Sequence, residues 1–250
     1  MRPEADNHNG DAGNPEHWQR ARTSDQKAQR IKAIEDAAGE LFVSHPYHKI
    51  TTAMIAGHAG FTRPNLYRYF RTKEEIFLSL LGHDMDAWIS HMQRDLSEGR
   101  VSTDIGIEAD DLMLEDESAG FAEVQRVARW WTDTLCAQPR LRFLLALLSS
   151  SLEENSSAAT LRTFKLQLWD QVQCMGEILM SVLPWFPENR VTEFATVNMA
   201  TVSGYTHMAQ RGPVHERVLE EAGLTEFSVD FYEAYRAALS TWLWGVRCFV

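Results

Sequence analysis

The sequence is poor in cysteine, glycine and proline, and it lacks long hydrophobic runs. Its 250 residues include three cysteines, 14 glycines and eight prolines, while 44% are hydrophobic. Turn-dense, β-rich segments are missing, so the composition predicts a soluble, mainly helical protein with a sizeable hydrophobic core. The cysteines form neither a Cys-x-x-Cys pair nor a cysteine–histidine ligand spacing. We therefore expect buried or incidental thiols in a reducing compartment and no metal site.

Two further absences concern the membrane and export. No uninterrupted run of about 18 apolar residues is present, so we expect no membrane-spanning helix. The first twenty residues also lack the apolar core of a signal peptide. Both absences favour a cytoplasmic protein without a membrane partner.

The formal net charge of −11 is unevenly distributed along the chain. Residues 20–73 contain ten lysines and arginines against four acidic residues, whereas residues 74–250 contain 13 basic and 27 acidic residues. No acidic residue stands between Glu40 and Glu74. Because carboxylates repel an approaching anion, this asymmetry indicates a local anionic partner. The alternative is a small basic patch that arose by chance.

Hydrophobic periodicity divides the chain into a tail and a series of helices. Residues 1–24 are polar and are predicted to form a disordered tail. An amphipathic helix is expected to begin at the cap residue Ser24 and to end before Pro46. An acidic connector is predicted at 102–117, and further helices are predicted over 118–137, 140–154, 157–183, 188–211 and a final apolar segment at 229–250.

Two short helices joined by a glycine turn follow the first helix. Thr51 or Thr52 provides the N-cap of the first short helix, and Thr62 provides that of the second. Gly60 ends the first one because glycine adopts a positive φ without steric cost. Leu66 then locks the two helices together. This arrangement is a helix-turn-helix, and DNA-binding versions place the second helix in the major groove.

The stretch "TTAMIAGHAGFTRPNLYRYFRTKEEIF", residues 51–77, resembles the DNA-binding domain of the TetR family of bacterial transcriptional repressors. The residues that match the family pattern are Thr52, Ile55, Ala56, Ala59, Gly60, Thr62, Leu66, Tyr67, Phe70, Lys73 and Glu74. The resemblance covers about residues 25–80 and implies an all-α fold. It implies an N-terminal three-helix DNA-binding head at 25–72 and a C-terminal helical domain at 73–250 for regulation, ligand binding and dimerisation.

The same resemblance identifies residues for contact with double-stranded DNA. Arg63, Asn65 and Arg68 are assigned to base edges, since arginine pairs with guanine and asparagine with adenine. Lys73 and the amides after Thr72 stand at a helix N-terminus, which favours a phosphate. The predicted DNA-binding residues are Thr51, Thr52, Thr62, Arg63, Pro64, Asn65, Tyr67, Arg68, Tyr69 and Lys73.

Some of these assignments have a second interpretation. Pro64 occupies a position where many family members carry glycine or alanine, so the base read there stays open. Tyr69 can instead pack against the first helix, and Thr62 can serve as a cap alone. The helix after Thr72 begins with a capping-box pattern that Glu75 completes three residues later.

The resemblance also implies a homodimer that binds a palindromic operator. The final helix is apolar on almost every face, which is more apolar area than a monomer exposes. Two helices from each subunit would form a four-helix bundle and set the recognition helices about 34 Å apart. The predicted interface residues are Val191, Phe194, Val202, Tyr205, Met208, Phe231, Tyr235, Leu239, Trp242 and Val246. The alternative is that the subunit's own core consumes both helices.

A small-molecule pocket is the second implied feature of the C-terminal domain. Eight tryptophans suit an apolar or aromatic ligand, although aromatic residues at helical spacing also form plain cores. The predicted pocket residues are Trp88, Trp130, Trp131, Phe164, Trp169 and His207. A ligand that binds better when the two heads are splayed would release the operator.

Motifs of catalysis and cofactor binding are missing from the sequence. There is no HExxH, no nucleophile elbow and no phosphate-cradling glycine loop, and "HDMD" at 83–86 lacks a third metal ligand at a useful spacing. We therefore predict a DNA-binding transcriptional regulator, a repressor, with no cofactor and no enzymatic activity. The alternatives are a helical interaction protein that does not bind DNA and a small helical enzyme.

Overall fold

The computed structural model describes residues 15–101, 116–210 and 212–249. Every regular element within these ranges is a helix, which confirms the predicted all-α class. The chain divides between Tyr69 and Phe70 into two compact units. The predicted tail at 1–14 and most of the predicted connector lie outside the described residues.

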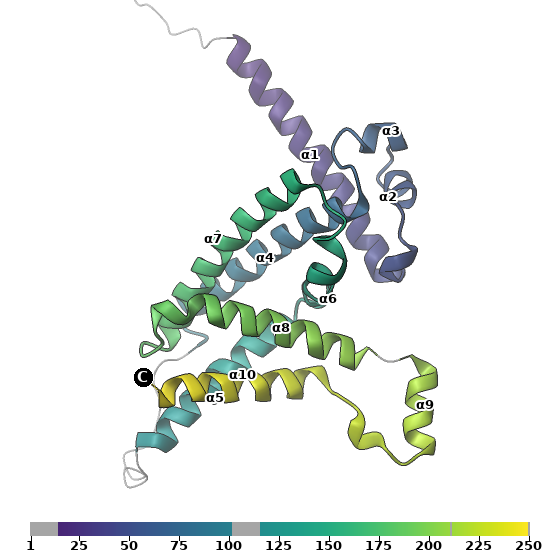
Figure 1. Cartoon of the computed structure of the whole chain (residues 1–250). Coiled ribbons are helices and arrows are strands. Elements are labelled where there is room, and N and C mark those ends of the chain that lie inside the picture. The colour runs from purple at the N-terminus through teal and green to yellow at the C-terminus, as the bar shows by residue number, and fades with distance from the viewer. Residues whose placement is uncertain (1–14, 102–115, 211, 250) are drawn as a thin grey trace, which may run out of the picture. The chain divides into compact units, whose positions relative to one another are not determined.

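The first unit consists of one long helix and two short ones. Its elements are α1 (Pro15–Ser44), the 3-10 helix η1 (Tyr47–Lys49), α2 (Thr52–His58) and α3 (Arg63–Leu66), as Figure 1 shows. α1 packs on α2, and α2 packs on α3. The core holds Ile34, Ala38, Leu41, Ile50, Ile55, Ala56 and Leu66. Because helices of four to seven residues are not stable alone, this shared core is what holds α2 and α3 in place.

The first helix starts earlier than the sequence predicted. α1 begins at Pro15, nine residues before Ser24, so residues 15–24 of the predicted disordered tail are helical instead. Proline fits the first turn of a helix, and the glutamate, glutamine, arginine and alanine that follow it favour helix. A polar composition argues against a packed core, but extending a helix that has already nucleated needs no core.

The second unit contains the remaining helices. They are α4 (Lys73–Ser97), α5 (Asp116–Cys136), α6 (Pro139–Leu147), the π-helix η3 (Leu148–Leu152), α7 (Ala158–Val182), η4 (Glu188–Arg190), α8 (Val191–Ala209), α9 (Pro213–Glu221), η5 (Thr225–Phe227) and α10 (Phe231–Cys248). The helix predicted at 140–154 is therefore α6 continued by η3, and α9 was not predicted. Among the described residues, no helix has both the length and the apolar character needed to cross a membrane.

The helices of the second unit pack as pairs that share partners. α4 lies along α7 and also contacts α6 and η3, while α8 contacts α6 and α10, and α10 contacts α5 (Figure 1). α7 approaches α8 closely at Gly176, where an added Cβ would lie 2.6 Å from a methyl group of Val191. The three cysteines are free, with Cys248 exposed and the other two half-buried.

Candidate nucleic-acid interface

The turn between α2 and α3 is closed by backbone hydrogen bonds. Thr51 caps α2, and its hydroxyl accepts a hydrogen bond from the Met54 amide at 3.2 Å. Gly60 follows the helix with a φ of 73°, and the Phe61 amide then donates to the Ala56 carbonyl at 2.8 Å. A residue with a Cβ would be strained at that φ, which is why glycine stands at this position.

α3 is a short helix that keeps one side in the core and the other in solvent. The amides of Asn65 and Leu66 both donate to the Thr62 carbonyl at 3.0 Å, and Leu66 is fully buried. The Thr62 side chain makes no capping hydrogen bond, so the structure does not support the interpretation of Thr62 as a side-chain cap. The side chains of Arg63, Pro64 and Arg68 are exposed, and Asn65 is half-buried.

Tyr67 follows α3 directly and connects the two short helices. Its phenolic oxygen lies 3.2 Å from the Thr52 hydroxyl and accepts a hydrogen bond from the Arg63 guanidinium at 3.3 Å. Hydrogen bonds from Thr52 and then from Arg63 lower the pKa of the exposed Tyr67 phenol. Thr52, Arg63 and Tyr67 therefore form one polar group at the surface, which we call the Tyr67 cluster.

Tyr69 forms a second surface contact, and it involves a residue that sequence reasoning missed. The Arg30 guanidinium on α1 donates to the Tyr69 hydroxyl at 3.1 Å. Tyr69 thus contacts the first helix, as its second interpretation proposed, and it also brings an additional cation to the surface. The signal for Arg30 was its membership of the basic stretch, but helical periodicity could not show which arginine lies beside Tyr69.

Two carboxylates of α1 contact side chains that carry or can accept a proton. Glu40 lies 2.6 Å from a ring nitrogen of His58, and Asp36 lies 2.7 Å from the Lys32 ammonium. Glu35 is buried. The stretch from residue 41 to 73 has no acidic residue, so every ionic side chain that α2 and α3 present to solvent is basic.

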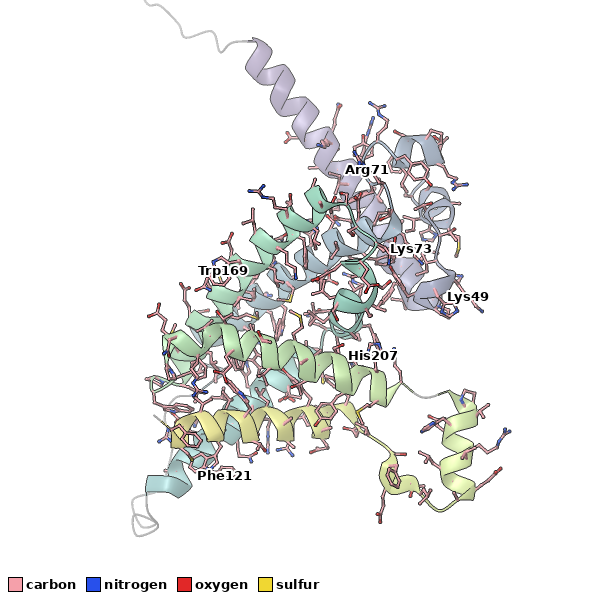
Figure 2. The ribbon with its side chains drawn as sticks, in the orientation of Figure 1. Lys49, Arg71, Lys73, Phe121, Trp169 and His207 are labelled. Carbon is pink, nitrogen blue, oxygen red and sulfur yellow. The ribbon has the colours of Figure 1, made fainter. Side chains whose placement is uncertain are left out.

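Lys73 and its cap belong to the second unit. Thr72 caps α4, its hydroxyl accepts a hydrogen bond from the Glu75 amide at 3.2 Å, and Lys73 is the first residue of the helix. Glu75 does not complete the predicted capping box, because its carboxylate accepts from the Arg71 amide at 2.8 Å rather than from the amide of Thr72. Figure 2 labels Arg71 and Lys73 at this helix start.

The predicted pocket residues lie in different surroundings within the second unit. Trp88, Trp131 and Phe164 are buried, and the first two pack edge to face with ring centroids 5.5 Å apart. Trp130 is half-buried and donates its indole N–H to the Asp95 carboxylate at 3.1 Å. Burial of Trp88, Trp131 and Phe164 is what the alternative of a plain aromatic core expects.

Two predicted pocket residues do line surface cavities, but different ones. Trp169, which is 53% exposed, lines a groove between α6, α7 and α8 with a volume of about 710 Å³. His207 borders another cavity of about 630 Å³, together with residues of α9 and η5. Figure 2 shows the two side chains on α7 and near the end of α8.

Most of the predicted interface residues contribute to the core of their own chain. Val191, Phe194, Val202, Phe231, Tyr235, Leu239 and Val246 are all buried within the single chain. This placement agrees with the alternative that the subunit consumes both helices, because helical periodicity does not tell which neighbour an apolar face meets. Tyr205 and Trp242 remain half-exposed, and Met208 is 54% exposed.

The acidic residues of "HDMD" have structural partners. Asp84 forms a two-point ion pair with Arg140, with N–O distances of 2.6 and 2.7 Å. Asp86 accepts hydrogen bonds from Gln167 and Gln171 on α7. Within the described part of the chain, no group of three or more histidine, cysteine or acidic residues is placed to hold a metal ion.

The chain is similar to known bacterial regulators along part of its length. It is 36% identical over 73 residues to a fatty acid metabolism regulator protein of Bacillus subtilis (strain 168), a match that covers 29% of this chain and 38% of that protein. It is 32% identical over 88 residues to the HTH-type transcriptional activator FasR of Mycolicibacterium smegmatis, covering 34% of this chain and 40% of that protein. The chain thus matches about two fifths of the length of these curated relatives.

Similarity to solved structures extends over more of the fold. The crystal structure of a TetR transcriptional regulator from Rhodococcus sp. RHA1 aligns with 87% of this chain and 97% of its own, at 13% identity and a TM-score of 0.50. The family model of bacterial regulatory proteins of the tetR family matches residues 34–80, and the model of the tetracyclin repressor-like C-terminal domain matches residues 83–248. Together these two models cover both units, so the chain belongs to the TetR family of bacterial regulatory proteins.

Proposed function

We propose that this chain is a transcriptional repressor that binds double-stranded DNA through α2 and α3. The observation that carries the proposal is the solvent side of α3, where Arg63 and Arg68 are exposed while Leu66 anchors the helix in the core. A helix anchored in this way can present its arginine guanidinium groups to a duplex while its own core packing stays intact. No carboxylate from the same stretch opposes the phosphates.

The exposed residues divide into two roles. Arg63, Asn65 and Arg68 lie on or just after α3 and suit base edges in the major groove. Thr51, Thr52, Thr62 and Lys73 lie at helix starts, where hydroxyls, an ammonium and backbone amides suit phosphates. The contact between Arg63 and Tyr67 restrains the guanidinium before DNA arrives, which reduces the entropy lost on binding.

We further propose that the regulator acts as a homodimer on a palindromic operator. Most of the predicted interface residues are buried in the core of their own chain. We therefore assign the dimer face to the side of α8 and α10 on which Trp242 remains partly exposed. Val197, Thr201, Ala238 and Trp242 border a shallow depression there, with a volume of about 10 Å³. Small side chains beside one large ring permit two helix pairs to approach closely across a two-fold axis.

A small-molecule ligand of the second unit is proposed to control DNA binding. Such a ligand releases the operator only if it binds better to the conformation in which the two heads do not fit adjacent grooves. α4 begins four residues after Tyr69, so it is the first helix of the second unit along the chain.

A selection of duplexes from random sequence, followed by a salt series, tests the DNA-binding proposal. We expect a palindromic site whose affinity falls steeply with salt, because each phosphate contact releases counterions. Arg63→Ala should relax the preference at one position of each half-site. Lys73→Ala should weaken binding to all duplexes equally. It should also reduce the slope of log affinity against log salt concentration by about one. Arg217→Ala on α9, far along the chain from these residues, is the matched control and should change neither.

The same experiment also distinguishes DNA binding from the alternative functions. Equal retention on heparin and on every duplex, even in dilute buffer, would reject the DNA-binding proposal. A helical interaction protein would behave in that way, since its basic surface would carry no base preference.

A further inference from the structure

We propose that the groove between α6, α7 and α8 binds a small organic anion with an apolar body, and that α4 senses this binding through residues 148–157. The inference deepens the proposed function and rests on it, because it names a ligand class and a route for the regulation. It differs from the predicted pocket, of which only Trp169 lines this groove.

The groove combines apolar walls with hydroxyl groups and a single charge. Its volume is about 710 Å³, and its lining residues are Leu145, Ser149, Lys165, Leu168, Trp169, Val172, Thr192, Ala195, Thr196, Met199, Ala200, Ser203 and Gly204. None of these is acidic, although acidic residues outnumber basic ones by 27 to 13 from Glu74 onward. A lysine in an apolar groove without an acidic lining residue is complementary to a ligand with one negative group, provided that the ligand replaces the Glu153 carboxylate at the ammonium.

The ammonium group of Lys165 in the groove forms an ion pair that a ligand anion can replace. The Lys165 ammonium lies 2.5 Å from the Glu153 carboxylate, and the side chains of Lys165 and Glu153 are 49% and 24% exposed. Ion pairs with this exposure contribute little to stability, so a ligand anion can replace Glu153 at the ammonium. Trp169 lies one helical turn after Lys165, and its exposed ring provides an apolar surface beside the charge.

Glu153 belongs to a segment that joins the groove to the first turn of α4. The segment starts with the π-helix η3, of which Ser149 lines the groove. It ends at Ser157, the N-cap of α7, whose amide donates to the Glu75 carboxylate at 3.3 Å. π-helical turns are rare and are frequently found at functional sites.

Two hydrogen bonds join the start of α4 to this segment, and a third joins it to the first turn of α7. The Thr72 hydroxyl donates to the Asn155 carbonyl at 3.3 Å, and the Thr160 hydroxyl donates to the same Glu75 oxygen as Ser157, at 3.0 Å. Thr72 and Glu75 are also the residues that start α4. A ligand anion that displaces Glu153 from Lys165 therefore frees a side chain two residues before Asn155, whose carbonyl accepts a hydrogen bond from Thr72, the N-cap of α4.

A fluorescent organic anion tests the site. We would titrate the full chain with 8-anilinonaphthalene-1-sulfonate and with N-phenyl-1-naphthylamine, which lacks the sulfonate. Lys165→Met should weaken the sulfonate at least about tenfold and leave the uncharged probe unchanged, because one charge-assisted contact is lost. Glu153→Gln should tighten the sulfonate, since it removes the competing carboxylate. Lys49→Met in the first unit is the matched control.

Two further outcomes decide whether the anion binds in this groove. Equal weakening of both probes by Lys165→Met, or no weakening of either, would overturn the anion site. Ala200→Trp narrows the groove and should abolish sulfonate binding while the particle mass in light scattering stays unchanged. A halved mass would show that a second copy of the chain occupies the groove and would overturn the proposal.

The route to α4 is tested by DNA affinity in fluorescence anisotropy. Saturating sulfonate should weaken operator binding by the native chain, and Glu75→Gln should keep sulfonate binding but remove this response. Thr72→Val, which removes a single bond of the route, should reduce the response if Glu75→Gln fails to fold. Sulfonate binding without any change in operator affinity would overturn the route. A native chain that binds no duplex would overturn the proposed function while the probe titrations still decide the site.

Discussion

At the scale of single residues, Gly60 determines whether the turn between α2 and α3 can form. Its φ of 73° is unfavourable for any residue with a Cβ, although open space surrounds the position. We expect Gly60→Ala to destabilise the first unit by about 1–2 kcal/mol through backbone strain alone. Hydrogen–deuterium exchange of amides in residues 50–70 measures this local opening, and exchange there should become faster.

Gly57 provides the control for that prediction. It lies inside α2 with open space around it and no positive φ. Alanine favours a helix interior by about 0.5–1 kcal/mol over glycine, so Gly57→Ala should slow exchange in the same residues. Equal exchange in both variants would contradict the assignment of strain to Gly60.

Gly176 is the second residue whose missing side chain matters. An added Cβ would lie 2.6 and 2.8 Å from the two methyl groups of Val191, a buried residue at the start of α8. We expect Gly176→Ala to lower the free energy of unfolding by about 1–3 kcal/mol, since the two helices must separate to admit a methyl group. Urea unfolding measures the change. Gly204→Ala, at a position with open space on α8, should not destabilise the chain.

At the scale of helices, Glu75 is the buried carboxylate that joins α4 to the start of α7. Burial alone would raise its pKa, but hydrogen bonds from the Arg71 amide, Ser157 and Thr160 together outweigh burial and lower the pKa below its ordinary value of 4.5. A lowered pKa in the folded state means that the folded chain favours the ionised carboxylate. The resulting stability is present above pH 4.5 and is lost as the pH falls through the lowered pKa.

Glu75→Gln tests this role of the carboxylate. At pH 7 the variant should be less stable by about 1–3 kcal/mol, because the amide cannot accept from all the donors that surround it. The difference in unfolding free energy from the native chain should shrink as the pH falls below 4.5, since the native carboxylate then loses its advantage. Glu177→Gln, at an exposed position on α7, should show neither effect.

Helix starts and local turns were predictable because their signals lie within a few residues. Thr51, Gly60 and Thr72 stand where the sequence indicated, since caps and positive φ values are local properties. The partners of Glu75 were not predictable, because Ser157 and Thr160 lie more than eighty residues away. A capping-box pattern favoured a bond within α4, whereas the fold supplied donors from α7 and from Arg71.

The apolar helices show the same limit for tertiary contacts. The sequence of α10 indicated correctly that it is apolar on several sides, and Phe231, Tyr235 and Leu239 are indeed buried. It could not tell whether these residues meet α5 and α8 of the same chain or a second chain. Aromatic residues gave the same ambiguity, because helical spacing alone did not separate Trp131, which is buried in the core, from Trp169, which lines the groove.

At the scale of the whole molecule, the proposed function divides between the two units. The first has a small core of its own and presents the Tyr67 cluster, Arg63 included, to solvent. The second contains the groove, the depression between α8 and α10, and the start of α4. A head with one short recognition helix makes few contacts, so the proposed dimer would raise affinity by placing a second head on the same duplex.

The proposed dimer face predicts how operator affinity depends on dimerisation. Thr201→Arg and Ala238→Arg each place a cation in the depression between α8 and α10, and we expect either variant to be monomeric in light scattering. Gln173→Arg, on an exposed side of α7, is the control and should remain dimeric.

A folded monomer should bind an isolated half-site as the native chain does, because α3 is unchanged. Its affinity for the full palindrome should fall about 10²–10⁴-fold, since the second head no longer binds at the high effective concentration that dimerisation provides. An arginine variant that stays dimeric would remove the depression from the interface, and a monomer with undiminished affinity for the palindrome would show that the two heads bind independently.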